Sequence, residues 1–253
     1  TRHERIHMSE SQSLKEIYYR LRYGADGKAG KYARKVEQRK EKFESQRWAQ
    51  GEDLAARNYE NYEEYLKHQA EKLDKYLDRR RGKEDDEYAE FLRRFGMADE
   101  IKGLRTALCL GARLGTEVKA LHEMGYFAIG IDLNPGPDNQ WVCVGDFHKL
   151  VFPDASVDLV YTNTLDHVFE LERVVAEIDR VLSPEGVFLT DVVPGFEEGF
   201  FPGEYESSHW RTVDALVERI EGAGRLQRVE TRDLGVKKRD RWYQLAFKRP
   251  QGD

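Results

Sequence analysis

From residue 105 onward, short apolar runs alternate with amphipathic segments. The apolar runs cover residues 105–111, 127–133, 141–146, 157–163 and 187–193. Helical spacing of apolar positions occupies residues 116–125, 170–186 and 210–224. Residues 225–234 and 241–249 have the pattern of a closing antiparallel pair. Strands that alternate with helices in this way predict a doubly wound α/β domain whose seven-stranded sheet is mainly parallel.

The region before residue 100 has a different pattern, which predicts helices. Apolar side chains recur at steps of three and four at Tyr59, Tyr62, Leu66, Ala70, Leu73 and Leu77. Further helices are expected over residues 31–48 and 84–95. Each has only a narrow apolar stripe, so these helices should pack on the second part, on each other or on a partner chain.

Composition divides the chain in the same place. Residues 1–100 carry 23 basic and 22 acidic side chains, whereas residues 101–253 carry 18 and 25. We therefore expect a helical N-terminal cap over residues 1–100 and an α/β domain over residues 101–253. The net charge of −6 argues against a dedicated nucleic-acid-binding protein.

Other composition features suggest where the protein works. The sequence contains no apolar run near the roughly 18 residues that span a bilayer, and its N-terminus lacks the apolar centre of a signal peptide. Its two cysteines, Cys109 and Cys143, cannot build a disulfide scaffold or a cysteine-rich zinc site. We expect a soluble cytoplasmic protein without a metal centre or a membrane partner.

Polar and glycine residues follow the predicted strands, where ligands bind in doubly wound sheets. Gly111-Ala112-Arg113-Leu114-Gly115 follows the first strand, and Asp132 ends the second. Asp146 ends the third, and Asn163 ends the fourth shortly before Asp166 and His167.

In these features, residues 105–193 resemble a class I S-adenosylmethionine-dependent methyltransferase. The segments that carry the resemblance are, in chain order, CLGARLGTE, GIDLNPG, VGDFHKLVF, FPDASVDLVYTN and RVLSPEG. The resemblance implies S-adenosyl-L-methionine as cofactor and a Rossmann-like sheet. It implies a cofactor site made of Gly111, Ala112, Arg113, Gly115, Asp132, Leu133, Asp146, Phe147 and Asn163.

The implied roles agree with simple chemistry. Glycines let the backbone approach the methionine part of the cofactor, and the carboxylate of Asp132 can accept both ribose hydroxyls. The resemblance further implies that Asp146 contacts the adenine amine, with Phe147 or Leu133 beside the ring.

Two positions depart from the family pattern. Cys109 stands where an acidic residue is usual, and Arg113 replaces the middle glycine of the turn. Arg113 could reach the carboxylate of the cofactor or point to solvent. These changes motivate an alternative, a non-catalytic relative that keeps the fold. A nicotinamide-binding domain is disfavoured, because the G-x-G-x-x-G fingerprint fails after Gly111.

Candidate catalytic residues follow the fourth and fifth strands. His167 could act as a general base or cap the next helix, and His209 could be a base or a loop residue. Asp166 could assist His167 or cap a helix.

The expected reaction is in-line transfer of a methyl group to an oxygen or nitrogen of a small molecule. A second alternative is an RNA or protein methyltransferase that uses the basic stretch 28–42, although such a stretch is more often a solvated face. Tyr18, Tyr19 and Tyr23 could line a substrate lid, and the N-terminal helices could also form a homodimer contact.

Overall fold

A computed structural model describes residues 28–45, 48–73, 83–136, 138–237 and 240–250 of the chain. The chain divides into two compact units, residues 1–47 and 48–253. In the first unit, helix α2 (Lys28–Ser45) carries the basic stretch and begins earlier than expected. Tyr18, Tyr19 and Tyr23 lie outside the described residues, so the lid expected of them stays a prediction.

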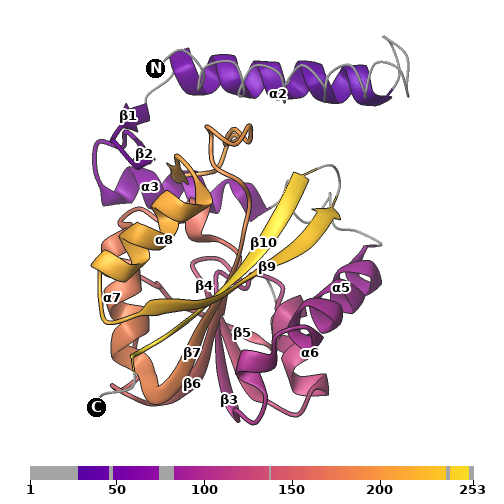
Figure 1. Ribbon diagram of the computed structural model, residues 1–253, viewed down its shortest axis with the longest axis vertical. Helices are drawn as coiled ribbons and strands as arrows, with labels where there is room; N and C mark the ends of the chain where they lie inside the picture. The colour runs from indigo at the N-terminus through magenta and orange to yellow at the C-terminus, as the bar shows by residue number, and fades with distance from the viewer. Residues whose placement is uncertain (1–27, 46–47, 74–82, 137, 238–239, 251–253) are drawn as a thin grey trace, which may run out of the picture. The chain divides into compact units, whose positions relative to one another are not determined.

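The second unit is built on a seven-stranded sheet with the order β5-β4-β3-β6-β7-β10-β9 (Figure 1). Its strands are β3 (Thr106–Leu110), β4 (Phe127–Asp132), β5 (Val142–Val144), β6 (Val157–Thr162), β7 (Leu182–Val192), β9 (Gln227–Lys237) and β10 (Asp240–Lys248). The pairs among β5, β4, β3, β6 and β7 are parallel, and β10 is antiparallel to both β7 and β9. The predicted doubly wound, mainly parallel sheet is confirmed.

Two pairs of helices cover this sheet, one pair on each face (Figure 1). On one face are α5 (Glu84–Gly96) and α6 (Thr116–Glu123), and on the other are α7 (Leu171–Val181) and α8 (Val213–Gly222). The apolar stripe of α7 is buried, and α8 begins at Thr212, whose side chain accepts a hydrogen bond from the N–H of Ala215. Helical spacing therefore predicted both helices, but residues 182–186, expected in the first, belong to β7, and Trp210, expected in the second, belongs to β8.

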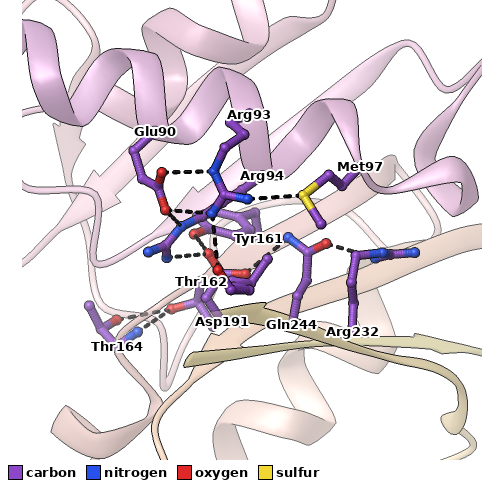
Figure 2. A network of polar contacts seen from close by, with 11 residues as sticks. Glu90, Arg93, Arg94, Met97, Tyr161, Thr162, Thr164, Asp191, Arg232 and Gln244 are labelled. Carbon is purple, nitrogen blue, oxygen red and sulfur yellow. Dashed lines mark hydrogen bonds and ion pairs between the residues drawn. The ribbon is translucent and has the colours of Figure 1, made fainter. Parts of the chain in front are cut away.

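Helix α5 is fixed to the sheet by a buried polar network (Figure 2). The Arg94 guanidinium donates to Asp191 in β7 over 2.9 Å, and both side chains are almost fully buried. Tyr161 donates to the same carboxylate at 2.7 Å, and Gln244 donates to its other oxygen at 3.0 Å. Arg94 balances the charge of the buried carboxylate, and the three donors satisfy its oxygens, which offsets the cost of removing it from water.

A second, smaller sheet was not foreseen from the sequence. Strands β1 (Trp48–Gln50), β2 (Leu54–Arg57) and β8 (Ser208–Trp210) pair antiparallel in the order β1-β2-β8. Trp48 thus belongs to a strand, whereas the sequence placed it at the end of a helix. Strands of three or four residues are too short to show a period of two.

Helix α3 (Tyr62–Ala70) follows β2 and begins three residues later than the apolar stripe suggested. The side chain of Asn61 accepts the N–H of Glu64 at 3.0 Å, which caps the helix at that point. Tyr65 and Gln69 are buried. The 3-10 turns are η1 (Asp99–Ile101) and η2 (Leu165–His167). Among the described residues, no helix combines the length and apolar character that crossing a bilayer requires.

Candidate active site

The strand register brings the sequence-predicted residues to one edge of the large sheet. Leu110 of β3 lies opposite Ile131 of β4 and Thr162 of β6. Because these strands are parallel, the residues that follow them meet at their carboxyl ends. Gly111, Asp132 and Asn163 are therefore neighbours in space, as the sequence predicted.

The turn after β3 needs both of its glycines. Gly111 has φ +68° and Gly115 has φ +74°, in the left-handed region that favours glycine. A Cβ on Gly111 would lie 2.3 Å from the Oγ1 of Thr164, and one on Gly115 would lie 2.6 Å from the Cβ of Trp141. Gly115 is also the N-cap of α6, whose first backbone N–H groups end at this edge.

Arg113 takes up the conformation of the glycine that it replaces. Its φ is +41°, which is uncommon for a residue with a side chain. Its Nε lies 3.8 Å from Oδ2 of Asp132, and its side chain is only 12% exposed. The alternative that Arg113 points to solvent is therefore wrong.

Asp132 is buried and held in place by backbone donors. Its Oδ1 accepts the N–H of Asn134 at 2.8 Å, and its Oδ2 accepts the N–H of Arg113 at 3.2 Å. A carboxylate has about four lone-pair positions, so both oxygens can still accept further donors. The buried side chain is thus fixed in position and keeps acceptor capacity on both oxygens.

Asp146 takes part in a polar cluster that the sequence did not reveal. The hydroxyl of Tyr62 donates to Oδ2 at 2.5 Å, while the N–H and Nδ1 of His148 both lie 2.8 Å from Oδ1. Burial alone would raise the pKa of Asp146, but the hydrogen bonds from His148 and Tyr62 outweigh it and lower the pKa to about 2. The carboxyl is thus ionised at neutral pH.

His148 is itself fixed by the backbone. Its Nε2 accepts the N–H groups of Phe169 at 3.1 Å and Glu170 at 3.3 Å. Nδ1 therefore carries the proton and donates to Asp146. The sequence offered no signal for this role, because Phe169 and Glu170, whose N–H groups hold the ring, lie more than 20 residues further along the chain.

The other predicted cofactor residues differ in exposure. Ala112 and Phe147 are buried, and Phe147 belongs to the apolar core between the sheet and α7. Leu133 and Asn163 keep part of their surface exposed. Of the two residues expected beside an adenine ring, Leu133 is the one whose surface is available to a ligand.

His167 lies at the same edge, in η2 after β6. Its Nδ1 is 2.8 Å from the backbone carbonyl of Tyr205, and its Nε2 is 2.7 Å from Nζ of Lys72. Burial and then the nearby Lys72 hold the pKa of His167 well below its usual range. The ring is therefore neutral at physiological pH, with its proton on Nδ1.

Two carboxylates complete this cluster. Oδ1 of Asp166 lies 3.7 Å from Nε2 of His167. One ligand atom from each of Asp166, His167 and Glu206 lies within 4.8 Å of the others, a spacing that a metal ion could use. The Nζ of Lys72 already contacts His167 Nε2, the nitrogen that a metal ion would need.

Helix α3 and the residues just after it contact segments at this edge of the large sheet. Tyr62 of α3 contacts Asp146 after β5, and Lys72, two residues beyond the helix, contacts His167 after β6. Gln69 donates to the carbonyl of Tyr205 at 2.8 Å, in the long segment between β7 and β8. The described contacts of this part of the chain therefore reach the segments that follow β5, β6 and β7.

His209, the second candidate base, lies inside strand β8. It is fully buried, pairs with Ala55 of β2, and its Nε2 is 3.2 Å from the carbonyl of Phe200. The rings of Phe196, Phe200 and Trp210 surround it. Its place in a packed strand favours a structural role.

Comparisons with known proteins agree with the doubly wound fold described above. Residues 108–190 match the family described as methyltransferase domain. No curated protein matches the chain by sequence.

Several solved structures resemble the chain. The Burkholderia thailandensis 1,6-didemethyltoxoflavin-N1-methyltransferase, with bound 1,6-didemethyltoxoflavin and S-adenosylhomocysteine, aligns with a TM-score of 0.59 at 16% identity over 80% of this chain and 97% of that one. The mitomycin 7-O-methyltransferase MmcR aligns with a TM-score of 0.54 at 15% identity, over 73% of this chain and 59% of MmcR. A chain of the complex between the Haloferax volcanii Trm112 methyltransferase activator and a methyltransferase gives 0.53 at 18% identity, over 72% and 98%. At these identities the likeness is one of fold.

Proposed function

We propose that the chain, whose residues 108–190 form a methyltransferase domain of the class I, S-adenosylmethionine-dependent kind, methylates an oxygen or nitrogen of a small molecule. The observation that carries this proposal is the position of α3. Tyr62 of α3 contacts Asp146, and Lys72 just after the helix contacts His167, so the acceptor would bind in an enclosed space instead of on an open surface.

The residues of the sheet edge fit the cofactor. The close approach of Thr164 leaves no room for a side chain at position 111, and the oxygens of Asp132 keep lone pairs for ribose hydroxyls. Leu133 and Asp146 would hold the adenine, with Ala112, Arg113, Gly115 and Asn163 around the rest of the molecule. Phe147 would support this site from the core.

When bound, S-adenosylmethionine supplies a methyl group already activated by the positive sulfonium. What the chain has to add is alignment of the acceptor with that methyl and exclusion of water. An acceptor that keeps a proton also needs a base, and His167 stands where the base is expected. The names of the toxoflavin and mitomycin enzymes, which act on small molecules, agree with this reading.

Conversion of S-adenosylmethionine to S-adenosylhomocysteine in the presence of small hydroxylated and amino-heterocyclic compounds tests the proposal. We expect turnover that falls about a hundredfold in His167→Ala, the usual contribution of a general base. His122→Ala is the matched control, because His122 lies on α6 beside Trp141. Full retention of rate in His167→Ala would reassign that residue to a structural role.

Calorimetry distinguishes the main alternative. If millimolar S-adenosylmethionine gives no heat of binding, the chain is a non-catalytic relative and the proposal fails.

The setting we propose is the cytoplasm, supported by the free thiols of Cys109 and Cys143. A homodimer contact through the N-terminal helices remains our proposal, and sedimentation at several concentrations would test it.

A further inference from the structure

We propose that Lys72 is a further catalytic residue, which forms one proton-accepting pair with His167 and takes the proton that the methyl acceptor loses. This inference rests on the proposed function. It assigns to the C-terminal end of the α3 segment a chemical role in addition to covering the site.

The first step of the argument is the tautomer of His167. A carbonyl oxygen only accepts hydrogen bonds, so the 2.8 Å contact with Tyr205 places the proton of the ring on Nδ1. The lone pair on Nε2 then faces Nζ of Lys72, 2.7 Å away. A second proton on Nε2 would put two cationic donors against each other.

The second step follows from that contact. While Lys72 is an ammonium, its N–H occupies the only basic nitrogen of His167, so the histidine cannot take another proton. The pair therefore becomes a base when Lys72 itself is a neutral amine. In the reaction, the acceptor oxygen or nitrogen bonds to the methyl carbon as the bond from that carbon to sulfur breaks. The sulfur keeps the electron pair, and the proton of the acceptor moves to Nζ of Lys72.

The surroundings of Lys72 make the neutral amine accessible. Within the described ranges, no carboxylate oxygen lies within 4.0 Å of its Nζ, and its hydrogen-bond partner is the uncharged imidazole. Burial and then the charge of Arg113 lower the pKa of Lys72 to about 8, although Asp166, Glu206 and Asp132 act in the opposite direction. A lysine whose pKa lies near 8 is a competent general base.

Charged and titratable groups surround the pair on both sides. Arg113 and His68 disfavour protonation of His167. Burial and then Glu206 raise the pKa of Asp166 to about 7, so this carboxyl offers less than a full negative charge near neutrality. The carboxyls of Asp166, Glu206 and Asp132 favour the ammonium of Lys72, but burial and Arg113 outweigh them.

The proposal predicts an unusual pH profile. If the pair is the base, kcat rises as pH increases through about 8, where Lys72 loses its proton. If His167 acted alone, kcat would reach its plateau below pH 6.5, because its pKa is well under its usual range. The two readings differ by more than one pH unit.

Kinetics of Lys72→Met test this directly. We expect the maximal kcat to fall about a hundredfold, and the remaining activity to rise at a lower pH than in the wild type, since only His167 is left. Lys67→Met is the matched control, because Lys67 is exposed on α3, five residues earlier in the chain, and its loss should leave both rate and profile unchanged. A wild-type plateau below pH 6.5, or an unchanged kcat in Lys72→Met, overturns the role of Lys72.

A titration of the protein without substrates gives a readout that does not need turnover. Nitrogen NMR of the imidazole should show His167 neutral with its proton on Nδ1 in the wild type, and its pKa should rise in Lys72→Met because a contacting cation is removed. An identical His167 titration in both proteins refutes the pair. If the coupling is present but no S-adenosylmethionine is turned over, the proposed function fails and the catalytic role fails with it. Thermal unfolding of each variant checks that it is folded.

Discussion

Arg113 shows how a single residue can depart from a sequence pattern while the backbone keeps the geometry. The glycine expected at this position would adopt a positive φ freely. Arg113 also adopts a positive φ, +41°, although it has a side chain. The side chain then reaches Asp132 and shields part of its charge. The backbone strain of a non-glycine residue in this region is about 1–2 kcal/mol.

A pair of substitutions separates this strain from the loss of the ion pair. Arg113→Gly and Arg113→Ala both remove the side chain, but only alanine keeps a Cβ in the left-handed conformation. We therefore expect the glycine variant to have the higher free energy of unfolding by about 1 kcal/mol, after allowance for the greater freedom of glycine in the unfolded chain. Urea denaturation measures the difference. Equal stabilities would mean that the turn relaxes around residue 113.

At the scale of elements, the sequence predicted the parts with a clear period. The stripe of α7 and the apolar runs of β3, β4 and β6 are confirmed because each is long enough, or buried enough, to show its pattern. Strand β2 was missed because it pairs with β8, about 150 residues away, and β1 was missed because it is a three-residue strand that pairs with β2. Local sequence patterns cannot predict contacts between residues so far apart in the chain.

In the candidate site, too, local sequence patterns could not predict contacts between distant residues. Gly111, Asp132 and Asn163 could be placed from their positions at strand ends. Tyr62 and Lys72 could not, because their roles depend on where α3 docks, and their spacing in the sequence fits an ordinary amphipathic helix. Tertiary packing alone brings Tyr62 to Asp146 and Lys72 to His167.

The docking of α5 leads to a prediction about stability. Arg94→Met removes the charge that faces Asp191 in the network of Figure 2, and leaves a buried carboxylate with fewer donors. We expect a loss of about 3–5 kcal/mol in the free energy of unfolding, as for other broken buried ion pairs. The control is Arg93→Met, because Arg93 is 43% exposed and pairs with the same Glu90. A loss below 1 kcal/mol in Arg94→Met would show that the network contributes little to the docking of α5.

At the scale of the whole molecule, the carboxyl edge of a parallel sheet collects chemistry from segments far apart in the chain. Residues after β3, β4, β5 and β6 meet there because parallel strands end together. The segment that contains α3 and Lys72 contributes hydroxyl and amine groups to the same place. In the function that we propose, the sheet edge would hold the cofactor, and the segment before it would supply groups on the acceptor side.

Calorimetric titration of S-adenosylhomocysteine into wild type and Asp132→Ala tests the central claim most directly, with exposed Asp214→Ala as the control. Loss of charge-assisted hydrogen bonds at Asp132 should weaken binding by about 1.5–3 kcal/mol, roughly ten- to hundredfold in Kd, while the control binds like the wild type. Equal affinities for wild type and Asp132→Ala would contradict a cofactor site at this edge of the sheet.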